Sequence, residues 1–483
     1  MKRYITTACL IVLSLGLFAQ NQTDALRYSW LNPSGTARFN SMGGAFNSLG
    51  GDFGAISQNP AGLGVYRSSE LTFTPGMMYS GTSSEYLNNK EHDFNYNAMM
   101  GNIGYVGTIL FENESDILKS MSFAFGYNQL QNFNQVTDIK GYNDNGSMTN
   151  YFAASSDGHR PENLGDFYEW PAYYSFLIDP LGADSTTYIS SYDAYGTRQK
   201  ELMQKSGNVG EYVFAMGVNL DDMFYLGASF GIQNVSFEQS KFYEESDSDD
   251  VISDFNYFTY RDRLVTDGTG YNLKLGGIVR PLDWLRASVA IHTPTFYNLH
   301  DEYSTEFVSN FDDTDKSTTY NSPTGIYNYK LTSPFRAQAG LAAVIYNNAI
   351  ISVDYEFLNY GISKLRASDD AFDVENDIIA ESYGAAHNIR AGAEYRLGLV
   401  AFRAGWAYFD SPYVDGEINA GASFMQYSGG IGLRSKSFFF DLAYVYYDRN
   451  EKYFLYEGYG VSSPVVDQNM TRHTMMATLG FRF

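Results

Sequence analysis

Residues 400–409, VAFRAGWAYF, alternate strictly between two kinds of side chain. One set is apolar and mostly aromatic: Val400, Phe402, Ala404, Trp406 and Tyr408. The other set is small or charged: Ala401, Arg403, Gly405 and Ala407. Because successive side chains of a strand point to opposite faces, this stretch predicts a β-strand with two unlike faces.

The same period-two alternation runs through most of the chain after residue 70. It is clear in residues 285–292, 351–357 and 438–446, where charged side chains again fall on one face only. The charge-free face is long and aromatic, whereas the outer face of a soluble sandwich is rich in Lys, Glu and Thr. The pattern therefore indicates a membrane barrel with lipid outside and a polar lumen inside.

Fourteen segments carry this pattern: 70–81, 96–111, 120–133, 209–219, 223–238, 268–281, 283–296, 330–346, 348–364, 385–397, 399–410, 422–435, 437–456 and 472–483. Tight joints such as LDD, PLD, NN and SKS alternate with long acidic loops, and ENESDILK is the longest of the short joints. An even strand number, short periplasmic turns and long outer loops are typical of bacterial outer-membrane barrels. We expect an all-β, 14-stranded antiparallel transmembrane β-barrel over residues 67–483, located in the cell outer membrane of a Gram-negative bacterium.

The composition fits a protein at a membrane interface. Aromatic residues make up 17% of the chain, with 41 Tyr and 35 Phe, and Tyr and Trp favour the boundary between lipid and water. The formal net charge of −23 argues against nucleic acid as a partner, because nucleic-acid binding needs clustered Lys and Arg. Ordinary solubilising surface charge explains the same value.

Residues 1–20 predict a secretory signal peptide. Lys2 and Arg3 precede a short apolar run over residues 5–18, and Ala19 marks a cleavage position. The only cysteine, Cys9, lies inside that run. The processed chain is therefore expected to carry no disulfide and no lipid anchor.

The last ten residues, TMMATLGFRF, repeat the alternation up to the final residue. Their apolar face holds Met475, Ala477, Leu479, Phe481 and Phe483. The last strand of a closed barrel must pair on both edges, because unpaired backbone groups in lipid are costly. A terminal Phe in this setting resembles the assembly signal of outer-membrane barrels, which implies that Phe483 contacts the barrel-assembly machinery.

Residues 21–66 lack the strand pattern, and we expect them to form an N-terminal, partly helical hatch. Apolar residues recur at helical spacing between residues 34 and 50: Phe39, Met42, Phe46 and Leu49. Ser34 or Thr36 can cap this predicted helix. Gly43 and Gly44 interrupt it at about 1 kcal/mol each relative to Ala, which indicates close packing against another backbone.

The hatch ends in Asn59-Pro60-Ala61-Gly62. Pro60 keeps Asn59 out of the helical region, and we expect Gly62 and Gly64 to turn the chain sharply into the first strand. A lumen of fourteen strands is too wide for wall side chains to fill, since about eight strands are the limit for a self-filled interior. The hatch is therefore expected to plug the lumen.

Residues 36–63, TARFNSMGGAFNSLGGDFGAISQNPAGL, resemble the N-terminal hatch of the FadL-like outer-membrane transporters of long-chain fatty acids and other hydrophobic compounds. The matching residues are Arg38, Met42-Gly43-Gly44-Ala45, Asp52, Ala55-Ile56 and Asn59-Pro60-Ala61-Gly62-Leu63. The order of hatch, fourteen strands and terminal Phe extends the resemblance over the whole chain. It implies that an apolar ligand diffuses from an outer-loop groove into the barrel, past a hatch that changes conformation, and out through a gap in the wall.

The resemblance also assigns roles within the hatch. The expected gating residues are Arg38, Gly43, Gly44, Asp52, Asn59, Pro60, Ala61 and Gly62. The expected ligand contacts in the hatch are Phe39, Met42 and Phe46. The segment Asn59–Gly62 is expected to act as the hinge of the plug, because Pro60 fixes one bend and Gly62 frees the next.

A very long outer loop is expected from about Gln135 to Asn208. It contains an apolar cluster in otherwise polar sequence, and the candidate ligand contacts there are Phe167, Trp170, Tyr174, Phe176 and Leu177. An exposed apolar cluster often marks a binding groove. The same residues would also suit a lid packed on the barrel rim, and the sequence leaves both interpretations open.

Inward-facing charges of both signs are expected on the wall: Arg286, Arg336, Asp354, Glu356, Arg390, Glu394, Arg396, Arg403, Asp441 and Arg482. An ion-selective pore favours one sign at its constriction. Mixed signs favour ion pairs that brace the wall and hold the hatch, through Arg38 or Asp52.

Signals for an enzyme are weak. Ser229 lies in a G-x-S-x-G pattern but in mid-strand, away from the strained turn that the mechanism requires. Ser288 and His292 share a strand face about 13 Å apart, beyond hydrogen-bond reach. The six His show no metal-binding spacing. The acidic segments that begin at Glu244 and Ser368 would suit divalent cations that bridge lipopolysaccharide, or simply solvated charge.

The sequence therefore predicts a monomeric, passive outer-membrane transporter of hydrophobic small molecules such as long-chain fatty acids, with no enzyme activity and no cofactor or metal. Its surroundings would be outer-membrane lipid and lipopolysaccharide. The alternative is a surface barrel that acts as a receptor or adhesin through its outer loops, with the hatch as a permanent plug.

Overall fold

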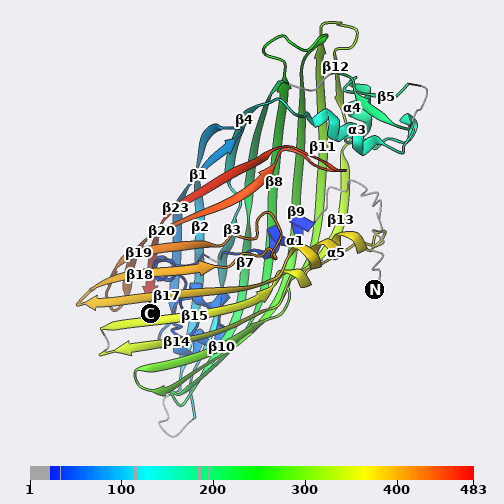
Figure 1. The fold of residues 1–483 in the computed structure, drawn as a ribbon. Coiled ribbons are helices and arrows are strands. Elements are labelled where there is room, and N and C mark those ends of the chain that lie inside the picture. Colours follow the sequence, from blue (N-terminus) through cyan, green and yellow to red (C-terminus); the bar gives the residue numbers. More distant parts are fainter. Residues whose placement is uncertain (1–21, 33, 112–116, 183–185, 193–195, 347) are drawn as a thin grey trace, which may run out of the picture.

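The computed structural model describes residues 22–32, 34–111, 117–182, 186–192, 196–346 and 348–483. The predicted signal peptide and most of the predicted joint ENESDILK lie outside the described residues. Fourteen antiparallel strands close into a barrel (Figure 1): β1 (Glu70–Tyr86), β2 (Asn89–Leu110), β3 (Leu118–Asn132), β7 (Thr197–Leu220), β8 (Phe224–Ser246), β9 (Phe255–Leu282), β10 (Leu285–His292), β14 (Arg336–Ile345), β15 (Ala349–Asn359), β17 (Ala385–Leu397), β18 (Val400–Phe409), β19 (Phe424–Arg434), β20 (Phe438–Phe454) and β23 (Val465–Arg482). The fold class and all fourteen predicted strands are confirmed.

The barrel closes where the last strand pairs with the first. Glu70 lies opposite Arg482, and Phe73 lies opposite Leu479, in the β1–β23 ladder. Phe481 is half exposed on the outer face, at 50% of its full surface, whereas Thr478 is buried on the inner face. The predicted lipid and lumen faces of the final strand are therefore correct.

The outer surface of the wall changes chemistry along each long strand. On β9 the outward residues Leu275, Leu273 and Tyr271 are apolar, and the outward residues beyond them, Asp267 and Arg263, are charged. The apolar band is the part that suits lipid. The sixteen residues of β9 beyond Tyr271 extend the sheet by about 50 Å above that band, at about 3.3 Å per residue.

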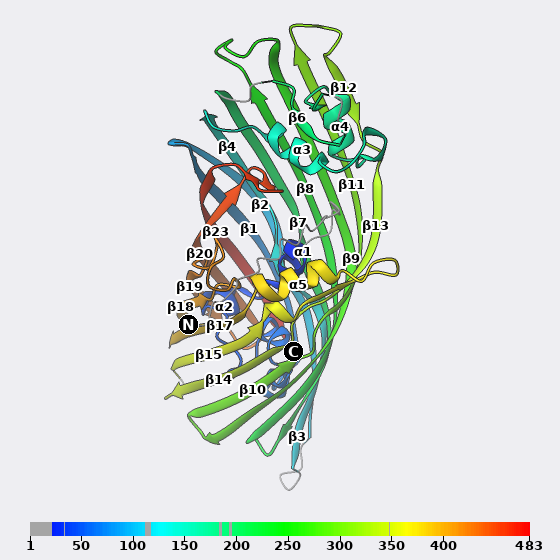
Figure 2. The same cartoon turned by 45° about the vertical axis from the view of Figure 1, so that its right-hand side comes forward.

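The tall wall corrects the prediction of long outer loops. Segments expected as loop are instead strands that continue the barrel wall on one side: β4 (Gln135–Asn143), β11 (Phe296–Phe311), β12 (Thr318–Asn321), β13 (Gly325–Thr332) and β16 (Lys364–Arg366). Figures 1 and 2 show this side rising far above the strands from β14 to β20. These additional strands are paired along most of their length. The outer end of the barrel is therefore built from β-sheet and not from loops.

A small lobe caps the tall wall. It contains α3 (Met148–Ser156), η3 (Pro161–Asn163), α4 (Glu169–Tyr174), β5 (Ile178–Pro180) and β6 (Tyr188–Ser190). The prediction of a single loop from Gln135 to Asn208 is thus wrong. Both ends of this segment are strands, and its middle forms the lobe. The lobe is held by the outer cluster, a set of buried aromatic and aliphatic side chains that includes Phe152, Tyr260 and Phe307.

Two short helices lie near the middle of the barrel, where Figure 2 shows α1 (Gln22–Ser29) beside α5 (Asp373–Ser382). The sequence did not predict either helix, and α5 overlaps the second half of the acidic segment 368–377, which was interpreted as a cation site or solvated charge. Two further small pieces complete the chain, η4 (Tyr360–Ile362) and the hairpin β21 (Glu457–Gly458) with β22 (Val461–Ser462). Among the described residues, no helix is long and apolar enough to cross a membrane.

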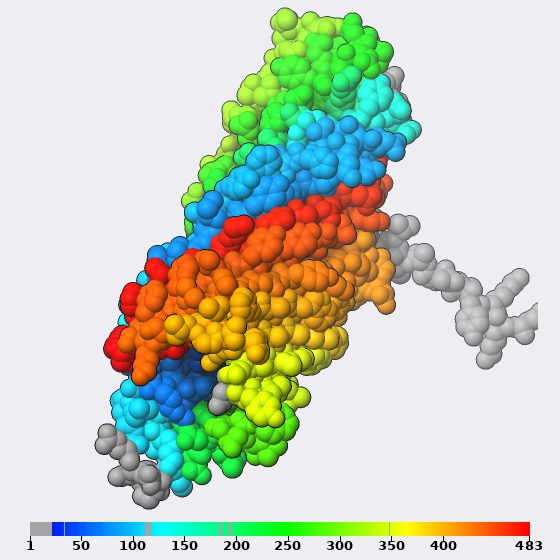
Figure 3. Space-filling model, turned by 90° about the vertical axis from the view of Figure 1, so that its left-hand side faces the viewer, coloured from blue at the N-terminus to red at the C-terminus, as the bar shows by residue number. Residues whose placement is uncertain are grey.

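The hatch fills the end of the barrel that carries the short turns, where its atoms are visible from outside (Figure 3). It contains α2 (Ala37–Ser41), η1 (Phe53–Ser57) and η2 (Pro60–Val65). The predicted helix between residues 34 and 50 is real only over these five residues of α2, with Thr36 as the N-cap. The helix stops there because Gly43 and Gly44 adopt φ of 64° and 73°, which a continuing right-handed helix does not allow.

Candidate functional site: the hatch and the lumen above it

The hatch touches the wall at glycines. Nine inward-facing glycines, each on a different strand, would place a Cβ within 3 Å of a hatch atom: Gly104, Gly126, Gly217, Gly227, Gly276, Gly340, Gly392, Gly405 and Gly430. We call these the wall glycines. A glycine in a strand interior weakens the strand, so their shared position shows where the wall omits side chains to make room for the backbone and side chains of the hatch.

The segment Met42-Gly43-Gly44 lies directly against β17 and β18. A Cβ on Gly405 would lie 2.1 Å from the Gly43 nitrogen, and one on Gly392 would lie 2.5 Å from the Met42 carbonyl oxygen. Gly43 also donates from its backbone to Ser428 Oγ at 3.1 Å. The predicted close approach to another backbone is confirmed for Gly43, whereas Gly44 faces the side chains of Phe39 and Arg390.

The segment Asn59-Pro60 is wedged against the opposite side of the barrel. A Cβ on Gly276 would lie 1.8 Å from Asn59 Oδ1, and one on Gly227 would lie 2.3 Å from the Pro60 carbonyl carbon. Asn59 caps η2 by accepting from the Ala61 nitrogen at 3.0 Å, and it donates to the Asn47 carbonyl at 2.8 Å. These bonds tie the two halves of the hatch together.

The expected role of Gly62 and Gly64 in a sharp turn is wrong. Both lie within the 3-10 helix η2, and neither has a positive φ. Their need for glycine is spatial: a Cβ on Gly62 would lie 2.9 Å from Gly50 Cα, and one on Gly64 would lie 2.5 Å from the Val218 carbonyl oxygen.

A belt of buried charges holds the first half of the hatch. Arg38 donates from Nε to Glu394 Oε2 at 2.9 Å. Glu394 also accepts from Arg396 and from Arg403, each at 2.6 Å in the closest contact. Arg403 continues the belt to Asp441 at 2.8 Å. Most of the mixed wall charges thus form ion pairs, and Arg38 links this belt to the hatch. Arg286 and Asp354 bond instead to backbone groups of the hatch.

Asp52 does not reach the wall. It accepts from Thr36 Oγ1 at 2.7 Å and from the Gly54 nitrogen at 2.9 Å, and it caps η1. Burial raises the pKa of Asp52, while the nearby Arg38 and the Thr36 hydroxyl lower it. Asp52 therefore braces the fold of the hatch itself, and the alternative that it pairs with a wall charge is wrong.

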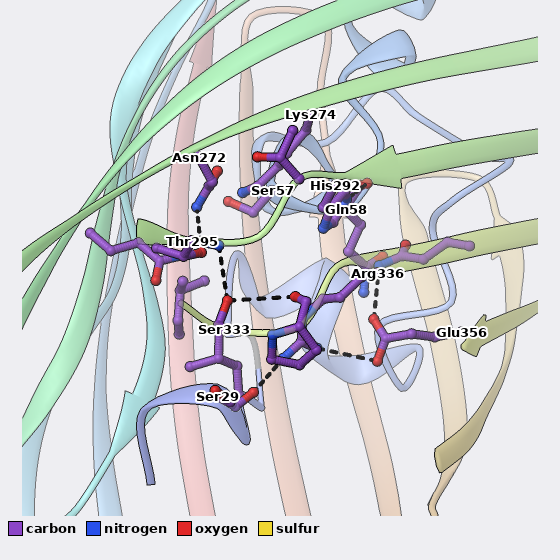
Figure 4. A pocket seen from close by; sticks show the side chains of 16 residues that line it. Ser29, Ser57, Gln58, Asn272, Lys274, His292, Thr295, Ser333, Arg336 and Glu356 are labelled. Carbon is purple, nitrogen blue, oxygen red and sulfur yellow. Dashed lines mark hydrogen bonds and ion pairs between the residues drawn. The ribbon is translucent and has the colours of Figure 1, made fainter. Parts of the chain in front are cut away.

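The second half of the hatch is held by polar side chains of β7, β9 and β10. Ser57 donates to Glu211 at 2.8 Å, and Glu211 pairs with Lys274 at 2.6 Å. The Gln58 carbonyl lies 2.6 Å from His292 Nε2. Ser57, Gln58, Lys274 and His292 border a cavity of about 40 Å³ with a largely polar lining, which Figure 4 shows.

The turn between the two halves is held by β10 and β15. The Asn47 nitrogen donates to Asp354 Oδ2 at 2.8 Å, and the Ser48 and Ser288 hydroxyls lie 2.7 Å apart. Arg286 donates to the Leu49 carbonyl at 2.6 Å. The hatch is therefore seated by hydrogen bonds and ion pairs on several sides of the barrel.

An apolar cluster lies in the lumen beyond the polar cavity that borders the hatch. Leu26 and Tyr28 of α1 join a mid-lumen cluster with wall residues such as Phe133 and Phe237. The Tyr28 ring lies edge-on to both rings, with centroids 6.3 and 6.4 Å away. Arg336 fixes the end of α1 by donating to the Ser29 carbonyl at 2.5 Å, as Figure 4 shows.

The same order of barrel and N-terminal hatch occurs in solved structures. The Pseudomonas putida toluene transporter TodX matches with a TM-score of 0.55 at 11% identity, over 93% of this chain and 98% of that one. A Pseudomonas aeruginosa FadL homologue matches with a TM-score of 0.56 at 13% identity, over 94% and 99%. The CymD monoaromatic hydrocarbon channel matches with a TM-score of 0.50 at 13% identity, over 93% and 97%.

This chain has the FadL fold. At these identities the likeness concerns the fold alone, and it covers the hatch as well as the barrel. No protein-family model and no curated protein matches the chain by sequence. A closed barrel of fourteen strands with an apolar outer band is the architecture of an outer-membrane β-barrel.

Within the FadL fold, the residues predicted to contact ligand fall into two groups. Phe39, Met42 and Phe46 are buried in the packing between the hatch and the wall. The others lie in the outer lobe, where Leu177 is fully buried and Phe167 and Trp170 are half-buried. Tyr174 and Phe176 remain exposed at 48% and 41%. The structure therefore does not bring the two groups together.

The described residues give no arrangement for catalysis or metal binding. Ser229 lies in the middle of β8 and is buried, away from any strand-to-helix turn. Ser288 bonds to Ser48 and His292 to the Gln58 carbonyl, so both groups are engaged with the hatch. In the part of the chain that the structure describes, no cluster of three His, Cys, Asp or Glu side chains could hold a metal ion.

Sequence analysis missed the wall glycines and α1. A signal for the glycines was present, because Gly405, Gly430 and Gly392 occupy the inward position of alternating strands where a side chain is expected. α1 has only eight residues and depends on the wall cluster for its burial. No local pattern could have placed it in the lumen.

Proposed function

We propose that this chain is a passive outer-membrane transporter that takes up hydrophobic small molecules through a barrel gated by its hatch. The observation that carries the proposal is the layering of the lumen. An apolar cluster of Phe133, Phe237 and the helix α1 lies above the hatch, with the small polar cavity between them, and the hatch is seated by reversible polar contacts. A hydrophobic solute could partition into the first layer and pass the second when local hydrogen bonds exchange.

The substrate class that we propose is long-chain fatty acids and similar hydrophobic compounds. The support is the apolar character of the outer and mid-lumen clusters, together with the names of the matched structures, a toluene transporter and a monoaromatic hydrocarbon channel. An apolar path discriminates weakly between ligands of similar hydrophobicity, so aromatic hydrocarbons belong in the same uptake test.

For the gate, we propose that Asn59–Gly62 is the fixed end of the hatch about which the preceding segment moves. The tight contacts of Asn59 and Pro60 with Gly276 and Gly227 support a fixed point. The turn at Asn47–Leu49 is held instead by single hydrogen bonds to Asp354, Ser288 and Arg286. Such bonds contribute only about 0.5–1.5 kcal/mol each, or about 1.5–3 kcal/mol when one partner is charged.

A disulfide between the hatch and the wall tests the gate. The Ser48 and Ser288 hydroxyl oxygens are 2.7 Å apart, so the pair S48C and S288C suits a crosslink between the moving turn and β10. Uptake of a long-chain fatty acid and of toluene by whole cells should stop in the oxidised variant and return with reductant. The expected absence of cysteine from the processed chain keeps the experiment free of competing thiols.

The matched control joins two wall strands and leaves the hatch free. Thr108 and Ser122 have hydroxyl oxygens 3.0 Å apart on β2 and β3, so oxidation of T108C with S122C should leave uptake unchanged. Deletion of residues 21–58 should open a leak to small polar antibiotics. If uptake survives the crosslink of Ser48→Cys with Ser288→Cys, the gate is wrong and a receptor or adhesin with a permanent plug becomes the better proposal.

The partners that we propose follow from this function. The chain would act as a monomer among outer-membrane lipid and lipopolysaccharide, with no cofactor. Phe483, 70% exposed at the end of the wall, would present its side chain to the barrel-assembly machinery.

A further inference from the structure

The hatch leaves a cavity of about 420 Å³ on its short-turn side. Its apolar lining comes from Leu49 and Val65 of the hatch region and from Val344 and Ile350 of the wall. Its polar lining is dominated by six arginines: Arg38, Arg67, Arg286, Arg396, Arg434 and Arg482. We call it the arginine chamber. Such a concentration of cations is unexpected in a chain with a formal net charge of −23.

The arginines surround the chamber from several sides. Arg286 comes from β10, Arg396 from β17, Arg434 from β19, Arg482 from β23 and Arg38 from α2. Guanidinium groups that converge from different strands match a tetrahedral oxyanion, which offers acceptors in several directions. The placement also puts the chamber at the periplasmic end of the barrel, because short turns mark that end in bacterial barrels.

The carboxylates near the chamber do not satisfy all of this charge. The lining arginines draw on four acids: Glu70, Asp222, Glu394 and Asp441. Glu394 and Asp441 are also bound by the fully buried Arg403. The arginines therefore outnumber the carboxylates with which they pair.

Two of the arginines have capacity left for a ligand. Arg286 donates to the Leu49 carbonyl at 2.6 Å and forms no ion pair with a carboxylate of the described residues. Arg434 contacts Asp441 through Nη2 at 3.2 Å and also lines the chamber. A guanidinium has five N–H donors, so this single contact leaves donors for an anion in the chamber.

We propose that the arginine chamber is a binding site for a small oxyanion of the phosphate class, and that its occupancy loosens the hatch. The second part follows from the contacts of Arg286. An oxyanion that engages Arg286 Nη1, the atom that donates to the Leu49 carbonyl, competes with that carbonyl directly, since a charged acceptor forms the stronger bond. Release of Leu49 frees the turn that contains Ser48. The site goes beyond the proposed uptake function and stands or falls without it.

Binding is tested on the purified, full-length processed protein in a detergent with an uncharged head group. Inorganic phosphate is titrated by calorimetry against a buffer of matched ionic strength that contains chloride. We expect one saturable site, with affinity reduced about tenfold or more in R286Q and in R434Q, since a hydrogen bond to a charged group is worth about 1.5–3 kcal/mol. R263Q is the matched control, because Arg263 is an exposed arginine of the upper wall.

Acetate is titrated in parallel to distinguish a site for phosphate from a site for carboxylates. Weaker binding of acetate supports the tetrahedral phosphate class, whereas tighter binding of acetate would replace it with a carboxylate. If neither anion binds saturably, or if R286Q and R434Q bind phosphate like the unaltered protein, the site is wrong. Unchanged thermal unfolding of the variants in chloride shows that a loss of binding is not a loss of fold.

The link to the hatch is tested by thiol labelling. Ser48 is fully buried, so S48C should react slowly with a maleimide and faster as phosphate saturates the site. Adding R286Q to S48C should make labelling fast and independent of phosphate. S122C, a buried position between β2 and β3, should not respond. Phosphate binding without any change in S48C labelling would overturn the link to the hatch.

Discussion

The hatch region and the outer lobe solve the same problem, closing a wide barrel, with opposite chemistry. The hatch meets the wall by close packing on the wall glycines and through buried ion pairs such as Arg38–Glu394. The lobe meets the tall wall through aromatic side chains, as where Phe307 packs between Phe152 and Tyr260 at centroid distances of 5.3 and 4.9 Å. Polar contacts can exchange one at a time, whereas an aromatic core separates only as a unit. The comparison indicates a movable closure below and a rigid one above.

The largest expected effect comes from the charge belt. Glu394→Gln leaves Arg38, Arg396 and Arg403 without their shared carboxylate, and breaking a buried ion pair from one side costs about 3–5 kcal/mol. Thermal unfolding, followed by heat-modifiable mobility on gels, should show the loss. Glu238→Gln is the control: its pair with Arg263 is exposed and worth only about 0–1 kcal/mol. Equal losses would mean that the belt does not stabilise the barrel.

A loss of stability of similar size, but confined to the lobe, is expected when Phe307 is shortened. Phe307 is fully buried, and Phe→Ala in a core costs about 3–5 kcal/mol. Phe307→Ala should speed protease cleavage within residues 144–182 while the barrel keeps its folded mobility on gels. Phe123→Ala, on the lipid face and 46% exposed, should leave that cleavage rate unchanged. Simultaneous loss of lobe and barrel would show that the two regions unfold as one unit.

The apolar band around the barrel should mark where the membrane meets the wall, and arginine substitutions on the outer face can locate its boundary. Val289 is 63% exposed on the apolar band, so Val289→Arg should cost about 2–4 kcal/mol near the bilayer midplane. Ile326 is 60% exposed but lies opposite Glu302 on the tall wall, so Ile326→Arg should be close to neutral. Urea unfolding in lipid vesicles measures both. A neutral Val289→Arg would place the membrane elsewhere on the wall.

The smallest expected change in stability probes the seat of the hatch. Gly276→Val pushes a side chain into Asn59, where a Cβ would already lie 1.8 Å from Oδ1, and overpacking typically costs about 1–3 kcal/mol. Its consequence should show as increased sensitivity of cells to polar antibiotics. Gly277, the next residue, faces outward with its nearest neighbour at 3.7 Å. Should Gly277→Val leak as much as Gly276→Val, the effect would belong to the strand and not to the hatch.

Much of the barrel follows from the sequence because its code is local and repetitive. Alternation in residues 400–409 fixes both the strand β18 and the face that Arg403 occupies, and the structure agrees. The same code was misread above the apolar band, because there the contrast is reversed: the inner face is apolar and the outer face is polar. In segment 296–311 the buried residues Leu299 and Phe307 alternate with outward polar residues such as Glu302, and this segment and 325–332 were taken as loops although the strands continue.

The presence of the hatch could be predicted from its sequence motif, but its contacts with the wall could not. The motif around Gly43 and Asn59 identifies the plug, and the positive φ of Gly43 ends the helix that apolar spacing predicts. The partner of Arg38 among the wall charges could not be chosen from the sequence, because several acids face the lumen. The arginine chamber was invisible for the same reason, since its members are brought together only by closure of the barrel.

A hydrogen bond between the hatch and the last strand bears on the order in which the chain folds. The Ala37 nitrogen donates to Thr478 Oγ1 at 2.7 Å, across a separation of 441 residues. The first part of the chain to leave the export channel must therefore wait for the last strand before its contacts are complete. Contacts this distant in sequence make folding slow, because the chain loses the entropy of closing a long loop before the contact can stabilise it. The hatch must travel unfolded, and its seating marks the end of folding rather than its start.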